Sequence, residues 1–428
     1  MAATQRSGTG PVAQPITTAA GHFLRSLARG GSTPSRLRLL MVVTAVLAVL
    51  FAVLGAFGVG RRDASLSAAT DAAQQLIDVQ NVQVSLVRAD ALASENYLRG
   101  TEDPAKRTQY VQELQLVSTG LVAVGNRVLA ADAALLADVS ASLGEYSGLV
   151  EQARANNRQG YPVGAAYLRN ANAVAADMVV TLREVQVSLR KQVNDNLDRA
   201  DKAGVWLHVV GWPLLLVVVA GSAWMTARFR RVVNVPVAAG GLLLLVLLVF
   251  GGISQGSSMS DAEAATSGPL QSADLVAQAR SAAFDAHSQE FFTLINRGNA
   301  QSNEVNWDTA RADADTALQR LCGRTNECEL GELFSTYAQR YEEMRALDND
   351  EGDWDAAVAL SLGDANTAFD AFAVSSQSAA DDYTDRAVSA LGSSSDGLST
   401  LRVVVFIGGL GIAVLALLGY GQRLREYR

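Results

Sequence analysis

Apolar residues are concentrated in four long runs along the chain. The runs cover residues 39–60, 205–225, 233–253 and 402–421, and none holds an Asp, Glu, Lys or Arg except Arg402, which stands at the edge of the last run. A helix needs about 20 predominantly apolar residues to cross a bilayer. Each run is therefore predicted to be a transmembrane helix. The arginine-containing leader of 38 residues before the first run argues against a cleaved signal peptide.

The two long segments between these runs, 61–204 and 254–401, follow a helical period and show no strand signal. Apolar residues alternate at steps of three and four, as in a coiled-coil seam. In the first segment they form three such rows: Tyr110, Leu114, Val117, Leu121, Val124 and Val128; Leu136, Val139, Leu143, Tyr146 and Val150; Met178, Leu182, Val185, Leu189, Val193 and Leu197. With an earlier helix that begins near Ile77, they predict an antiparallel four-helix bundle. No breaker separates its first and last helices from the adjacent membrane spans, which predicts continuous helices.

The second segment repeats this plan. "SENYLRG" (94–100) resembles "SQEFFTLINRG" (288–298), and "GYPVGAAYLRNANAVAAD" (160–177) resembles "GDWDAAVALSLGDANTAFD" (352–370). Each copy of the unit has two spans, so both bundles face the same side, as in a parallel repeat. The predicted fold class is an all-α membrane protein with four transmembrane helices and two extracytoplasmic antiparallel four-helix-bundle modules, arranged as a tandem parallel repeat.

Arginine placement predicts the orientation. The leader, the short loop and the tail together carry 11 positive charges and one negative charge, so the positive-inside rule puts both termini in the cytoplasm. The predicted organisation is a disordered basic cytoplasmic leader (1–38), transmembrane helix 1 (39–60), bundle 1 (61–204), transmembrane helix 2 (205–225), a cytoplasmic arginine loop (226–232), transmembrane helix 3 (233–253), bundle 2 (254–401), transmembrane helix 4 (402–421) and a cytoplasmic tail (422–428). The predicted location is the plasma membrane.

The charge of the chain is strongly polarised. The first outer segment has 15 basic and 17 acidic residues, whereas the second, counted with Arg402, has 9 and 25, a net charge of −16. Such an acidic surface favours docking of a complementary protein over direct capture of an anionic amino acid. The inner cations are predicted to contact a cytoplasmic partner or anionic lipid: Arg228, Arg230, Arg231, Arg423 and Arg425. Nothing in the sequence supports nucleic-acid binding.

The chemistry-bearing residues are few. Cys322 and Cys328 lie in the second outer segment and are predicted to form a disulfide that closes a tight turn between helices. His287 lies on a helix seam between two phenylalanines, and we interpret it as a hydrogen-bonded core residue in preference to a ligand. No catalytic, phosphate-binding or metal-binding motif occurs, so no enzyme, cofactor or metal site is predicted.

Two further stretches carry a resemblance. "VRADALASENYLRG" (87–100) and "NNRQGYPVGAAYLRNANA" (156–173), together with the order of spans and helical segments, resemble the GlnX family of actinobacterial membrane proteins. The resemblance implies an amino-acid sensing relay, in which an extracytoplasmic solute-binding protein, GlnH, senses aspartate and glutamate. The GlnX protein then passes that state to a soluble Ser/Thr kinase, PknG.

The sequence thus predicts a non-enzymatic sensor that relays a nutrient signal from a GlnH-like binding protein outside to a PknG-like kinase inside. Two alternatives stay open: a direct small-molecule chemosensor of the four-helix-bundle type, and a structural scaffold of the cell envelope. Ligand-dependent melting would distinguish the first alternative, and co-purification with envelope machinery the second. The sequence does not determine the oligomeric state.

The predicted topology can be tested with reporters fused after residue 150 and after residue 330. Both should report the extracytoplasmic side, because an even number of spans separates them. A reporter that is active only in the cytosol at either position would contradict the topology.

Overall fold

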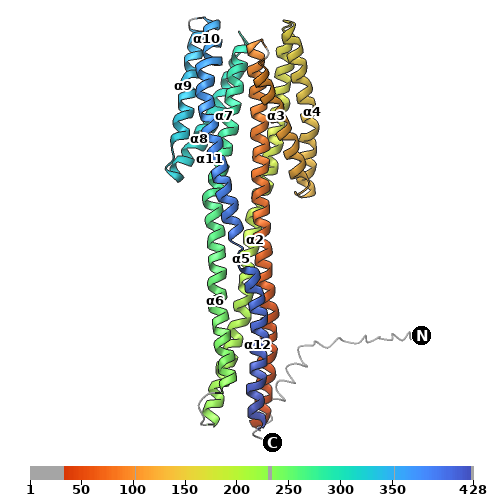
Figure 1. Ribbon diagram of the computed structural model, residues 1–428, viewed down its shortest axis with the longest axis vertical. Coiled ribbons are helices and arrows are strands. Elements are labelled where there is room, and N and C mark those ends of the chain that lie inside the picture. Colours follow the sequence, from red (N-terminus) through yellow and green to blue (C-terminus); the bar gives the residue numbers. More distant parts are fainter. Residues whose placement is uncertain (1–32, 102, 230–233, 351, 426–428) are drawn as a thin grey trace, which may run out of the picture. The chain divides into compact units, whose positions relative to one another are not determined.

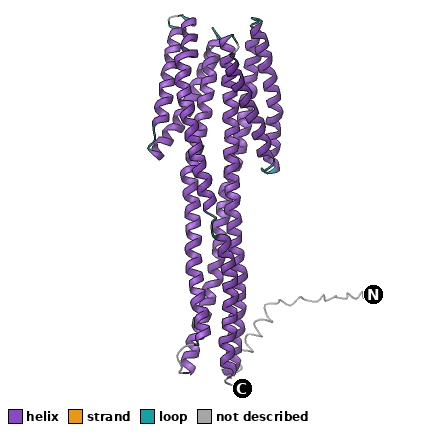
Figure 2. Cartoon of the chain, viewed as in Figure 1, coloured by secondary structure: helices purple, strands orange, loops and turns teal. Residues whose placement is uncertain are grey.

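A computed structural model describes residues 33–101, 103–229, 234–350 and 352–425, and the elements are labelled as in Figure 1. In this part of the chain the protein is helical and contains no strand, as Figure 2 shows. The helices in chain order are α2 (Thr33–Arg99), α3 (Pro104–Gly125), α4 (Ala130–Arg158), α5 (Val163–Phe229), α6 (Val235–Ala265), the π-helix η1 (Thr266–Leu270), α7 (Gln271–Ile295), α8 (Gln301–Thr325), α9 (Glu329–Asn349), α10 (Trp354–Leu360), the π-helix η2 (Ser361–Ala365), α11 (Asn366–Ser393) and α12 (Leu398–Arg425). The predicted all-α class is confirmed.

The chain divides into two compact units. The membrane unit holds the described residues up to Asp63, Asp201–Gly256 and those from Gly397 onward, while the outer unit holds Ala64–Ala200 and Ser257–Asp396. Four helical stretches are long and apolar enough to cross a membrane, and each contributes to the membrane unit. This identifies a multi-pass membrane protein. The boundaries between membrane and outer segments, and the orientation of the termini, stay predictions.

Small residues let the helices of the membrane unit approach closely. A Cβ atom on Gly409 of α12 would lie 2.7 Å from the Cβ and 2.8 Å from the Cα of Ala52 on α2. Gly211 of α5 is similarly close to Leu248 of α6. Large apolar side chains of this unit are exposed on its surface, for example Leu216, which is 69% exposed. Such exposure suits a lipid environment.

The helices that leave the membrane unit differ in continuity. α2 and α5 each run unbroken for 67 residues and cross the unit boundary, as the absence of breakers predicted. α6 also crosses the boundary unbroken, and η1 follows it inside the outer unit. By contrast, a turn ending at Gly397, whose φ is +81°, separates α11 from α12. Only the first half of the chain therefore has two uninterrupted helical connections between the units.

The first half of the outer unit is the predicted four-helix bundle, built from α2, α3, α4 and α5. The three predicted rows supply its core, with Tyr110, Val117, Tyr146 and Leu182 all buried. Asp103 caps α3 by accepting a hydrogen bond from the backbone N–H of Ala105, at 2.8 Å. Local capping and the apolar period thus agree on the same helices.

The two halves of the outer unit pack together through α2 and α7. Gln80 donates to Asp274, Gln83 donates to Ser281 at 2.6 Å, and the hydroxyls of Ser94 and Ser288 lie 3.2 Å apart. The sequence separation between these partners stays between 194 and 198, so α2 and α7 run in the same direction. Because the two outer segments pack against each other, they lie on the same side of any bilayer that the chain crosses.

The close approach at Gly409 generates a prediction. Gly409→Ala should destabilise the protein by about 1–3 kcal/mol, because the new methyl group collides with the backbone of α2. Gly411→Ala on the same helix is the control, since its Cβ meets only Leu243, at 3.9 Å, and it should be neutral or stabilising by up to about 1 kcal/mol. Thermal unfolding in detergent, followed by circular dichroism, measures both; equal effects would contradict the packing.

Candidate functional site

The predicted cysteine pair forms a disulfide in the structure. Cys322 in the last turns of α8 is bonded to Cys328, which precedes the first residue of α9. Between them Asn326 adopts the left-handed conformation with a φ of 59° and ends α8. The disulfide therefore fixes the α8–α9 connection, and it lies apart from the polar clusters described below.

The predicted cytoplasmic arginines lie at the ends of the membrane-unit helices. Arg228 belongs to the last turn of α5, and Arg423 and Arg425 to the last turn of α12. Arg230 and Arg231 fall outside the described residues. Their contact with a partner or with lipid stays a prediction.

A buried carboxylate, Asp90 of α2, lies at the contact between the two halves of the outer unit. Its Oδ2 accepts hydrogen bonds from the Ser288 hydroxyl of α7 and from the Asn172 amide of α5, both at 2.7 Å. Burial is the largest influence on this group and raises the pKa of Asp90 to about 6, although the two hydrogen bonds oppose the shift. Asp90 thus joins three helices and both halves through one titratable group.

A second buried carboxylate, Glu290 of α7, organises the other half. It accepts hydrogen bonds from the Tyr337 hydroxyl at 2.8 Å and from the Ser361 hydroxyl at 2.6 Å, and His287 Nδ1 lies 3.1 Å away. His287 Nε2 is 3.2 Å from Asn366, and its ring stacks on Phe369 with centroids 3.9 Å apart. His287 is therefore a hydrogen-bonded core residue, as we interpreted it.

The π-helix η2 helps to build this cluster. Ser361 is its first residue and Asn366 follows its last, so the two residues that meet Glu290 and His287 lie at its two ends. A π-turn inserts one residue into a helix and changes which side chains face the neighbouring helix, and such turns are frequent at functional sites. The helical period of the sequence does not reveal it.

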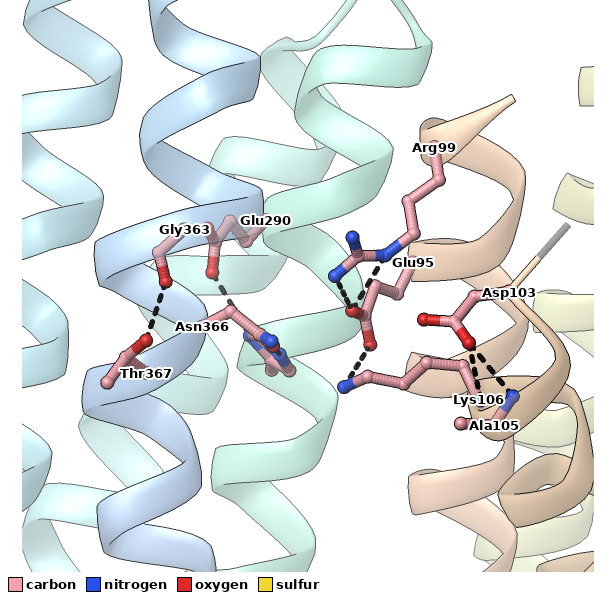
Figure 3. A network of polar contacts seen from close by, with 10 residues as sticks. Glu95, Arg99, Asp103, Ala105, Lys106, Glu290, Gly363, Asn366 and Thr367 are labelled. Carbon is pink, nitrogen blue, oxygen red and sulfur yellow. Dashed lines mark hydrogen bonds and ion pairs between the residues drawn. The ribbon is translucent and has the colours of Figure 1, made fainter. Parts of the chain in front are cut away.

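In the first half of the outer unit, the residue that corresponds to Glu290 is Glu95. Its carboxylate is 2% exposed and is paired with Arg99 at 2.5 Å and with Lys106 at 2.9 Å; Figure 3 shows these cations together with Glu290 of the second half. The shared sequence signal is "DALASE" (90–95) and "DAHSQE" (285–290), which places two acids five residues apart in each half. Asp90, Glu95 and Glu290 are buried, whereas the Asp285 side chain reaches solvent. Our sequence analysis compared the stretches around these residues but missed this pattern.

A cavity of about 50 Å³ lies inside the first bundle, near the end of α2. Side chains of α2, α3, α4 and α5 line it, and the polar ones are Asn96, Tyr97, Arg107, Tyr110, Arg154, Asn157 and Arg158. Our sequence analysis named only Tyr110 among them, as a member of an apolar row, because these residues occupy separate helices and converge only in the folded bundle.

The first four-helix bundle is the part of the chain that matches a known family model. Residues 65–198 match the family model of the actinobacterial sensor domain. The match covers the four helices that enclose the cavity and Asp90. No curated protein and no solved structure gives a significant match.

The match supports a role as a sensor or transducer and points to a non-catalytic one. The match is consistent with the resemblance of the sequence to an actinobacterial family. It gives no information about a solute-binding protein or a kinase as partners. Among the described residues, no group of three or more His, Cys, Asp or Glu side chains could hold a metal ion.

The buried Asp90 generates a prediction. Because its pKa is raised to about 6 in the folded protein, the folded state binds more protons than the unfolded state between about pH 4 and pH 6. The free energy of unfolding should therefore fall as pH rises through this window, by roughly 3 kcal/mol in total. Asp90→Asn lacks this titration and should lose that part of the pH dependence.

Unfolding of wild-type protein and of Asp90→Asn, measured from about pH 4 to pH 7, checks this. Partial desolvation also raises the pKa of Asp285. Asp285 titrates in both proteins, so the difference between their pH dependences reports the replacement at position 90, including the repulsion between Asp90 and Asp285. If the free energy of unfolding depends on pH equally in the two proteins, the pKa of Asp90 is the same in the folded and unfolded states, which would contradict the prediction.

Proposed function

We propose that this protein is a non-enzymatic transmembrane sensor that relays an extracytoplasmic nutrient signal to a cytoplasmic Ser/Thr kinase. One observation carries the proposal: the segment that matches the sensor domain begins and ends on α2 and α5, and both helices continue unbroken into the membrane unit. A sensor that ends in continuous helices can pass a displacement through its own backbone.

Helix shifts of about 1–2 Å are an established way to transmit such a state. In a continuous α-helix the backbone hydrogen bonds resist stretching, so a displacement of one end moves the other. In α5, Pro213 removes one of these bonds within the membrane unit. A turn such as the one before α12 absorbs the displacement through its free dihedral angles. α2 and α5 are therefore the signalling helices of the proposal, and α12 serves packing.

The proposed outer partner is a solute-binding protein that carries the amino-acid signal. The net charge of −16 on the second outer segment supports a protein partner of complementary charge. The resemblance to the GlnX family adds the identity of the two partners as GlnH-like and PknG-like. Inside, the cations at the ends of α5 and α12 are proposed to meet the kinase.

Partner capture tests both ends. The intact protein, isolated in mild detergent from its own host, should bring down a solute-binding protein and a Ser/Thr kinase that mass spectrometry identifies. Replacing Arg228, Arg230 and Arg231 by glutamine should lose the kinase and keep the binding protein. Recovery of neither partner with the wild-type protein would contradict the relay.

Helix continuity can be tested at the unit boundary. Ala64 is an exposed residue of α2, and Ala64→Pro removes a backbone hydrogen bond and kinks the helix there, at a cost of about 3 kcal/mol. Ala64→Pro should keep the outer partner but lose the amino-acid-dependent change in kinase activity, whereas Ala64→Ser should keep both. Normal signalling through Ala64→Pro would exclude α2 as the carrier.

A second candidate function is direct sensing of a small molecule by the first bundle. The cavity between its helices favours this function, and it requires no binding protein. Both functions use α2 and α5 as the output.

A further inference from the structure

The two halves of the outer unit leave a groove between them, lined by side chains of α2, α3, α7 and α11. The groove has a volume of about 490 Å³ and is open to solvent. Sites for small organic molecules have volumes of about 300–1,000 Å³ and combine apolar walls with a few polar groups. The groove therefore has the size of a small-molecule site, and its polar side chains decide which molecule fits it.

Arg280 of α7 is a buried cation in the lining of this groove. Its side chain is 3% exposed, and its Nε–H group is buried without a hydrogen-bond partner. Its Nη2 donates to the side-chain oxygen of Gln377 on α11, and it forms no ion pair with any carboxylate of the described residues. A buried donor without a partner costs free energy. Arg280 therefore offers an N–H group that an anionic oxygen in the groove can accept.

A second guanidinium group, that of Arg88 on α2, lines the same groove. Burial, and next the charge of Arg88, lower the pKa of Arg280 to about 10, while the more distant carboxylates of Asp381 and Glu113 oppose this shift. The two guanidinium groups therefore repel each other. A negative group beside Arg280 would offset this repulsion.

Most of the charges that line the groove already have partners. Arg88 pairs with Glu113 at 3.2 Å, and Asp78 pairs with Arg127 at 2.5 Å. The two other charged side chains of the lining, one positive and one negative, form no ion pair within the described part of the chain. The groove is therefore neutral overall, which favours a ligand that carries both charges over a simple anion.

These two charges, Arg280 and Asp381 of α11, are joined by the side-chain amide of Gln377. Its oxygen accepts from Arg280, and its nitrogen donates to Asp381 Oδ1 at 2.8 Å. The amide thus turns its negative end to the cation and its positive end to the acid. The carboxylate and ammonium groups of an α-amino acid, which share one carbon atom, have the same polarity over a similar length.

The rest of the lining bears on the side chain of such a ligand. Val82 and Val84 of α2 and Leu116 and Val124 of α3 supply apolar surface. The other lining charges are already in ion pairs, so a charged ligand side chain would lose hydration without gaining a free partner. The lining therefore favours an uncharged, aliphatic side chain.

We propose that this groove binds an α-amino acid with an uncharged aliphatic side chain, with its carboxylate on Arg280 and its ammonium group on Asp381. The inference goes beyond the proposed relay, in which a separate binding protein holds the amino acid, and it does not depend on that relay. The polar contacts lie on α7 and α11 and the apolar contacts on α2 and α3, so the occupant joins the two halves of the outer unit.

Calorimetry and thermal melting of the full chain in lipid nanodiscs test the site, with L-leucine as the probe. L-Leucine should bind saturably and raise the melting temperature. Two matched compounds each lack one charged group: 4-methylpentanoate lacks the ammonium group, and L-leucinamide lacks the carboxylate. Each should bind at least tenfold more weakly. Absence of L-leucine binding would overturn the proposal, and so would equal binding of either matched compound or tighter binding of L-glutamate.

Two variants locate the binding. Arg280→Gln should weaken L-leucine binding at least tenfold, and Arg386→Gln, at an exposed position of α11, is its control. Asp381→Asn should also weaken binding at least tenfold, whereas Asp382→Asn should bind as the wild type does, because Asp382 pairs with Arg386 and does not line the groove. Circular dichroism checks that each variant is folded. If Arg280→Gln does not fold, the exposed Asp381→Asn decides; wild-type affinity in Asp381→Asn would overturn the inference.

The Asp381→Asn variant also distinguishes a binding role from a structural one. Loss of the negative charge removes the partner of the ammonium group but leaves Arg280 for the carboxylate. Asp381→Asn should therefore bind 4-methylpentanoate at least as tightly as L-leucine, which reverses the preference of the wild type. An unchanged preference for L-leucine would contradict the proposed orientation of the ligand.

Binding is measured on purified protein without partners, so it is separate from the relay. A groove that binds no amino acid would overturn this inference and leave partner capture and the Ala64→Pro comparison untouched. L-Leucine binding that depends on Arg280 and Asp381 would support the site even if partner capture recovered neither a binding protein nor a kinase.

Discussion

The contact between α2 and α7 holds the outer unit together. Apolar residues of both helices belong to one core cluster, and polar pairs lie among them: Gln83 donates to Ser281, and Asp90 accepts from Ser288. Each such bond contributes only about 1 kcal/mol, but a buried group that loses its partner costs about 1–3 kcal/mol. The polar pairs therefore fix the register of the two parallel helices more strictly than an apolar seam would. Because the contact joins the first half to the second, a change in either half can reach the other.

The two halves use equivalent positions for different chemistry. Glu95 is neutralised by two cations at the end of α2, whereas Glu290 is held by neutral hydroxyls and by His287. The second half is filled by stacked and edge-to-face aromatic rings around Phe369, while the first encloses a cavity. The first half thus leaves a hollow among its four helices, whereas aromatic rings occupy the centre of the second half. This division agrees with the sensor-domain match, which covers the first half.

Helix continuity follows the same division. The half that contains the cavity is attached to the membrane unit by two continuous helices. The other half is attached by α6, which crosses the boundary as a continuous helix and reaches η1 only inside the outer unit, and by a turn that ends at Gly397. A π-turn and a turn with free dihedral angles transmit a displacement less faithfully than a continuous helix does. The first half therefore has one more continuous helical connection to the membrane unit than the second half has.

Much of this architecture follows from the sequence alone. The four apolar runs, the seams through Tyr110 and Val117, and the missing breakers next to α2 and α5 report local properties, namely hydrophobic period and helix propensity, and each determined an element by itself. The pairing of Asp90 with Ser288, the ends of η2 at Ser361 and Asn366, and the convergence of Arg107 and Arg158 on one cavity depend on contacts between distant segments. The tertiary structure alone decided these features, because a one-dimensional period states which face of a helix is buried but not which face of another helix will cover it.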